Sequence, residues 1–217
     1  MASYDASDLV PFLRDAAAAI GATVADAPSD LKGYRFNAEV LSDAISGRTM
    51  QRQDSDLPQS VEALSLDGFA VLIGVLSGPP VRPSVGSQLR RYRNQATIAR
   101  SWLGSAAPNL HLFLAAPAGA YRDPEWRQIA TEIEGDDRVC RKLVWLFDEA
   151  PSAESAREFM ERTFVARPWP AVQRSERLDS MASFALPTGW EDAIQDPDLD
   201  NTGLVEKLLD LERELEL

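Results

Sequence analysis

Hydrophobic and polar residues follow several distinct patterns in the first part of the chain. Residues 8–20 carry apolar side chains at helical spacing behind a serine or aspartate that can cap the start, which predicts a helix. Residues 33–41 alternate strictly between apolar and polar, which predicts a strand with one solvated face. Residues 61–66 and 68–78 predict a short strand and a buried strand, and the Pro- and Gly-rich segment 78–87 predicts a break in regular structure.

The pattern from about residue 69 to 165 alternates strands with helices. After the buried strand, it predicts a helix, a strand, a helix, a strand and a helix at 87–104, 109–117, 123–136, 138–148 and 152–166. Strands joined by helices of this length pair in parallel. We therefore predict an α/β fold with a mixed sheet and a parallel βαβ core, because the earlier strands have no helices between them.

The end of the chain has a different pattern. We expect residues 1–170 to form a single α/β domain and residues 171–217 to form an acidic segment containing an amphipathic helix at 203–216. Four leucines recur along that helix at spacings of four, three and four: Leu204, Leu208, Leu211 and Leu215. Such a narrow apolar line docks either on the chain's own domain or on a partner helix.

The composition is that of a globular protein and its charge is unevenly distributed. Of 217 residues, 45% are apolar and 26% charged, and the formal net charge is -12, which argues against general nucleic-acid binding. No acid lies between Asp67 and Asp123, whereas several arginines do. The single cysteine fits a reducing compartment, and neither a signal peptide nor an apolar run long enough to span a membrane is present. We expect a cytoplasmic protein with one basic face.

The residues offer little for catalysis. Cys140 and the only histidine, His111, lie in successive predicted strands, but both are at strand starts, whereas open α/β sheets place reactive groups beyond strand ends. The sequence has no phosphate-binding loop, dinucleotide-binding motif or hydrolase elbow, and it has too few cysteines and histidines for a zinc site. We predict no catalytic, cofactor-binding or metal-binding residues and regard Cys140 as structural.

A metal-dependent nuclease is the alternative enzyme. Asp148 and Glu149 follow a predicted strand, where carboxylates could hold Mg²⁺. Glu39, Glu62 and Asp67 lie near the early strands, but no acid-x-lysine pair follows them. A strand-ending acid close to a proline is more often a turn former or helix cap, so we favour that interpretation.

The helix at 88–103 carries the most distinctive surface. Arg90, Arg93 and Arg100 fall on one line together with Thr97. These arginines could pair with the chain's own acidic tail, with an acidic partner, or with phosphates in a nucleic-acid-binding module, and the sequence leaves all three open.

Three stretches resemble a known family. They are YRNQATIARSWLG at 92–104, DPEWRQIATEIEGDDRVCRKLVWLF at 123–147 and FMERTFVARPWP at 159–170. They resemble the middle components of bacterial three-component defence systems built around an ABC-type ATPase, of the SMC- or OLD-like, Lamassu type. The resemblance implies a non-enzymatic adaptor that binds an ABC/SMC-like ATPase subunit and an effector subunit in anti-phage or anti-plasmid defence. It implies contact with nucleic acid only within the complex, and no membrane.

The third stretch adds a second candidate contact surface. Arg162, Arg167 and Trp169 combine the side-chain types that dominate binding hot spots. The alternative for Trp169 is an internal role, in which the indole closes the domain's own core.

Overall fold

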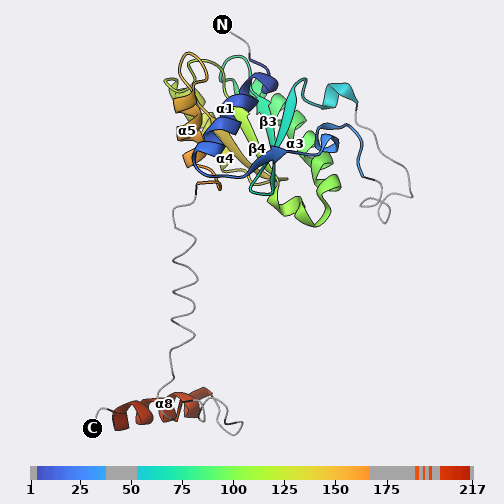
Figure 1. The fold of residues 1–217 in the computed structure, drawn as a ribbon. Coiled ribbons are helices and arrows are strands. Elements are labelled where there is room, and N and C mark those ends of the chain that lie inside the picture. Colours follow the sequence, from blue (N-terminus) through green and yellow to red (C-terminus); the bar gives the residue numbers. More distant parts are fainter. Residues whose placement is uncertain are drawn as a thin grey trace. The chain divides into compact units, whose positions relative to one another are not determined.

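The computed structural model describes residues 4–37, 53–166, 189–190, 193, 196 and 201–215. The chain divides into two compact units, Met1–Ala166 and Arg167–Leu217 (Figure 1). None of the helices in these described parts combines the length and apolarity needed to cross a membrane.

Unit 1 is built on a five-stranded mixed sheet. Its strands are β1 (Val24–Asp26), β2 (Val61–Leu66), β3 (Phe69–Val75), β4 (His111–Ala115) and β5 (Arg141–Trp145), and they lie side by side in that order. The pairs β1–β2 and β2–β3 are antiparallel, whereas β3–β4 and β4–β5 are parallel. The predicted mixed α/β fold with a parallel βαβ core is confirmed.

Helices cover both faces of this sheet. Helices α3 (Arg82–Leu103) and α4 (Pro124–Glu134) pack on one face in a core that includes Leu72, Leu112 and Val144. Helices α1 (Ala6–Ala19) and α5 (Ala153–Glu161) contact each other and pack on the other face (Figure 1). Short 3-10 segments lie at Ser29–Lys32, Asp54–Asp56 and Gly104–Asn109. Because β3, β4 and β5 run in parallel, their carboxyl ends meet at one edge of the sheet.

Local sequence explains where α3 and α4 begin. Asp123 precedes α4, and its Oδ1 accepts hydrogen bonds from the backbone N–H groups of Glu125 (2.8 Å) and Trp126 (3.3 Å). The predicted break at 78–87 is wrong for its last six residues, because α3 begins at Arg82 with Pro83 in its first turn. Proline is tolerated there since the first N–H groups of a helix have no intrahelical acceptor.

The strand predicted at 33–41 is wrong over 33–37, and the rest of it lies outside the described residues. Only an isolated bridge residue, Arg35, is extended-paired here, and the backbone of this segment bonds to side chains of α3. Buried Gln95 donates through Nε2 to the carbonyls of Leu31 (2.7 Å) and Gly33 (2.8 Å). Trp102 Nε1 donates to the carbonyl of Arg35 (2.8 Å). One edge strand of the sheet is β1, three residues that carry little periodic signal.

Unit 2 contains the helix α8 (Asn201–Leu215), which confirms the predicted C-terminal helix. Before it, the N–H of Ala193 donates to the carbonyl of Gly189 (3.1 Å), and Ala193 is buried. Lys207 on α8 lies 3.7 Å from the carboxylate of Asp196.

Candidate functional site

A cleft of about 560 Å³ lies at the carboxyl ends of β3 and β4. Its walls are the loops that follow these two strands, 76–80 and 116–120, together with side chains from four other places in unit 1: Tyr4, Asp123, Trp126 and Phe147. The lining is mainly apolar, and prolines and aromatic rings provide much of it. Such an edge is where open α/β sheets bind ligands.

A second, polar pocket of about 160 Å³ adjoins this cleft and shares Tyr4, Val75 and Ser77 with it. Gln88 on α3 fixes the common wall, because its Oε1 accepts from the Ser77 N–H (2.9 Å) and its Nε2 donates to the Ser77 carbonyl (2.9 Å). The polar pocket continues toward Gln59, Ser60 and Arg91. The apolar cleft therefore lies next to a polar pocket that contains a cation, Arg91, at the same end of the sheet.

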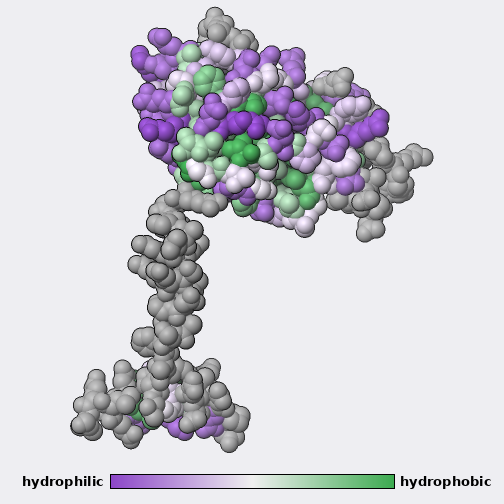
Figure 2. All heavy atoms as spheres, in the orientation of Figure 1, coloured by the Kyte–Doolittle hydropathy of each residue, from purple (hydrophilic) through white to green (hydrophobic). Residues whose placement is uncertain are grey.

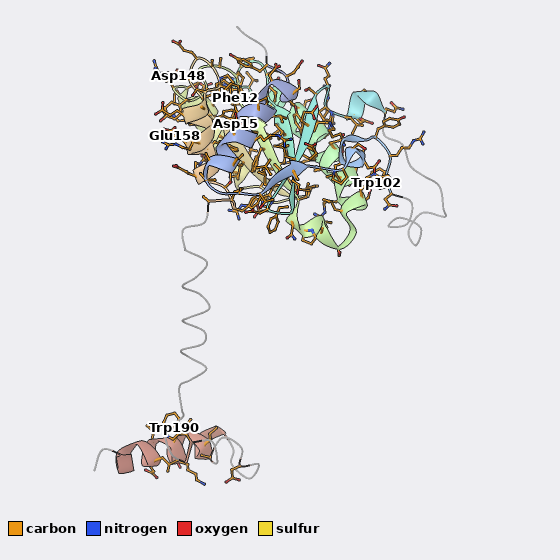
Figure 3. The ribbon with its side chains drawn as sticks, in the orientation of Figure 1. Phe12, Asp15, Trp102, Asp148, Glu158 and Trp190 are labelled. Carbon is orange, nitrogen blue, oxygen red and sulfur yellow. The ribbon has the colours of Figure 1, made fainter. Side chains whose placement is uncertain are left out.

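Of the acids in the nuclease alternative, Glu39 lies outside the described residues, and the described ones do not assemble into a metal site. Asp148 pairs with Arg122, and its backbone carbonyl accepts a hydrogen bond from the N–H of Gly119. Glu149 is exposed, and Asp148 lies on the opposite side of unit 1 from Trp102 (Figure 3). Glu62 pairs with Lys32 (2.7 Å). Among the described residues, no three His, Cys, Asp or Glu side chains gather closely enough to hold a metal ion.

Cys140 and His111 lie in different cores and cannot form a dyad. Cys140 is buried in the core beneath α3 and α4, and burial raises the pKa of its thiol to about 11. The His111 ring contacts the ring of Phe164 at a tilt of 33°, and Phe164 packs against the core on the other face of the sheet. Burial lowers the pKa of His111. Both side chains are uncharged near neutral pH and serve packing.

The arginines predicted on one line of α3 have different surroundings. Arg93 pairs with Asp136, and Arg100 donates to the carbonyl of Val139, so both hold the loop between α4 and β5. Hydrogen bonds from Arg138 hold the pKa of Asp136 well below its usual range, with the nearby charges of Lys142 and Arg93 adding to the effect. Arg90 alone of the three is exposed.

Lys142 is a structural residue that the sequence pattern did not reveal. It is fully buried, and its ammonium group donates to the carbonyls of Asp136, Arg138 (2.9 Å) and Cys140 (3.0 Å). The loop that it closes includes Val139 at φ 73°, a left-handed conformation that is rare for a β-branched residue. No periodic signal distinguishes this lysine from the exposed Arg141 next to it.

The second candidate contact surface is described only in part. Arg162 donates to both carboxylate oxygens of Glu134 (2.9 Å each). Glu134 Oε1 also accepts the backbone N–H of Val144 (2.8 Å), so this pair joins α5 to the edge strand. Arg167 and Trp169 lie outside the described residues.

The leucine line of α8 is partly covered within its own unit. Leu204, Leu208 and Leu211 are half-buried. Leu211 packs closely on Gly189, because a Cβ added to that glycine would lie 3.2 Å from Leu211 Cδ2. The side chain of Leu215 is outside the described set. Val205 and Leu209, which the line of leucines does not include, are 56% and 47% exposed. These two residues are one turn apart and form an apolar strip on α8.

Comparison with known proteins gave one finding that bears on class. Residues 81–168, which run from the start of α3 past the end of α5, match the family model described as ABC-three component (ABC-3C) system Middle Component 1. The match covers less than half of the 217 residues. It makes this part of the chain similar to an accessory component of an ABC system. Searches of curated proteins and of solved structures found no significant match.

Proposed function

We propose that this protein is a non-enzymatic accessory subunit of an ABC-type ATPase complex. The observation that carries the proposal is the match of residues 81–168 to a middle component of an ABC-three component system. Those residues contain α3, β4, α4, β5 and α5, which make up most of the parallel part of unit 1. In this proposal the α/β unit is a rigid body that presents surfaces to other subunits.

The finer assignment follows the resemblance of the three stretches quoted above. We propose an SMC- or OLD-like, Lamassu-type ATPase as the partner and a cytoplasmic role in anti-phage or anti-plasmid defence. The subunit links the ATPase to an effector or to DNA. Arg93 and Arg100 hold the chain's own loop, so of the three predicted arginines on α3 only exposed Arg90 remains for nucleic acid. This favours the adaptor over an isolated nucleic-acid-binding module.

Helix α8 supplies the contact surface that we favour. Its exposed Val205 and Leu209 form an apolar strip beside the exposed acids Glu206 and Asp210. An amphipathic helix of this kind binds a groove through apolar anchors, with charged residues setting the choice of partner. The strip therefore suits an apolar groove with a basic rim on the ATPase or the effector. Arg162, Arg167 and Trp169 remain a second proposed surface.

Co-purification tests this function. The tagged chain is co-expressed with the ABC-type ATPase that we expect to be encoded beside its gene, and the complex is followed by affinity capture and size-exclusion chromatography. We expect co-elution that is lost when Val205→Asp and Leu209→Asp are combined. Lys207→Gln, an exposed residue on the other side of the same helix, is the matched control and should leave the complex intact.

Two results would contradict the proposal. One is the absence of any complex with the neighbouring ATPase when both proteins are soluble and folded. The other is turnover of a substrate by the purified chain alone, abolished by changing one defined side chain.

A further inference from the structure

The carboxyl-edge cleft and the polar pocket next to it combine two recognition chemistries that the adaptor function does not use. The cleft offers flat apolar surfaces from three prolines (Pro79, Pro80 and Pro117) and three aromatic residues (Tyr4, Trp126 and Phe147). Its volume of about 560 Å³ is within the range of small-molecule sites, which is about 300–1,000 Å³. Figure 2 shows apolar patches, in green, set among hydrophilic surface on the face of unit 1 that it draws.

Arg91 brings an uncompensated charge to the polar end. Its side chain lines the polar pocket, it is half-buried, and its Nε is shielded from solvent with no hydrogen-bond partner. Arg91 forms no ion pair with any described residue, in contrast to Arg93 on the same helix. An anion in the pocket would pair with this guanidinium, which lines the pocket without a carboxylate partner among the described residues.

Two acids lie near the site. Asp123 lines the apolar cleft, but its carboxylate accepts the N–H groups at the start of α4. Asp5 lines the polar pocket and is the N-cap residue of α1, where its backbone N–H donates to the Asp8 carboxylate (2.9 Å). Asp5 forms no ion pair with Arg91, so the guanidinium is left to face the pocket.

We propose that this edge binds a small aromatic anion, with its flat ring in the apolar cleft and its charged group at Arg91. Apolar walls with one well-placed cation are the usual composition of a site for such a ligand. The ring gains the apolar contact area, and the anion gains a charge-assisted hydrogen bond from a half-buried guanidinium. A neutral ring would gain only the apolar contact.

Two fluorescent probes with nearly the same ring system separate the two contributions. One is 1-anilinonaphthalene-8-sulfonate, an anion, and the other is N-phenyl-1-naphthylamine, its neutral counterpart. Each is titrated into the purified full-length chain as wild type, Arg91→Gln, Arg90→Gln and Ala118→Phe. Arg90 is exposed and adjacent in sequence, so its variant is the matched control for loss of one positive charge. Ala118 lines the cleft, and a phenylalanine there fills it.

We expect saturable binding of the anion that weakens about tenfold in Arg91→Gln, whereas the neutral probe is unaffected. Arg90→Gln should change neither probe, and Ala118→Phe should weaken both. If Ala118→Phe fails to fold, Pro79→Trp at the exposed rim of the cleft replaces it. Equal losses from Arg90→Gln and Arg91→Gln, or equal losses for both probes in Arg91→Gln, would overturn the proposal. So would unchanged binding when the cleft is filled.

Discussion

The contact between Tyr92 and Gly74 allows the effect of substitutions on the free energy of unfolding to be predicted from geometry. Tyr92 is on α3, only 4% exposed, and its hydroxyl lies against the end of β3. It accepts the N–H of Val75 (2.8 Å) and donates toward the carbonyls of Val75 (2.9 Å) and Ser60 (3.2 Å). Burial raises the pKa of Tyr92, so the hydroxyl keeps its proton and remains a donor.

The cost of Tyr92→Phe follows from these bonds. A phenol has one proton, so the substitution removes one accepted and one donated hydrogen bond at any moment, each worth about 0.5–1.5 kcal/mol net. Because the Val75 groups remain part-buried without a partner, we expect a loss of about 2 kcal/mol in the free energy of unfolding. In a chain of this size that corresponds to a fall of about 4–8 °C in Tm.

Gly74→Ala perturbs the same contact by overpacking. A Cβ on Gly74 would lie 2.2 Å from Cε1 and 2.5 Å from Cζ of Tyr92, which is far inside van der Waals contact. The ring is held by its hydroxyl and cannot simply rotate away, so we expect a loss of about 1–3 kcal/mol or more. The same change in a Tyr92→Leu background, where the ring is absent, should cost much less.

Chemical denaturation followed by circular dichroism measures each variant, and Gly86→Ala is the control. Gly86 is also on α3, but nothing lies within 4 Å of its added Cβ, so its replacement should be neutral or slightly stabilising through helix propensity. If Gly74→Ala costs as much with leucine at position 92 as with tyrosine, the steric argument is wrong. If Tyr92→Phe leaves the free energy of unfolding unchanged, the hydrogen-bond argument is wrong.

Three further outcomes are expected. Because burial raises the pKa of Cys140 to about 11, its thiol should react with iodoacetamide at pH 8 at least about 100-fold more slowly in the native protein than in the protein unfolded in urea. Equal rates in the two states would show that the native thiolate is accessible. The pKa of Asp136 is lowered from 3.8, so its contribution to stability is present above that pH and is lost as the pH falls below it. When the free energy of unfolding is measured by urea denaturation at a series of acidic pH values, Asp136→Asn should therefore reduce its dependence on pH. An unchanged pH dependence would argue against this role of Asp136. Gln95→Leu should cost about 1–3 kcal/mol, measured by thermal unfolding, because the carbonyls of Leu31 and Gly33 lose their donor. Replacement of the exposed Gln128 on α4 by leucine is the control and should cost little.

The parallel core could be predicted from the sequence because its signals are local. The strands around Leu72, Leu112 and Val144 are continuous apolar runs, and the helices between them show apolar residues at helical spacing. The candidate site could not be predicted in the same way. The cleft is assembled from Tyr4, two strand-end loops, Trp126 and Phe147, and nothing in their sequence spacing relates them.

The sequence by itself determined the α/β class, the order of the core elements and the amphipathic C-terminal helix, because periodicity and end signals depend on near neighbours. Only the tertiary structure decided how individual polar groups are used. Residues 33–37 alternate like a strand, yet their backbone is held by α3, and Arg93 and Arg100 support a loop while Arg90 and Arg91 do not. The physical reason is that hydrogen bonds and ion pairs are made with partners distant in sequence, and the energy of a buried polar group depends on whether such a partner is present.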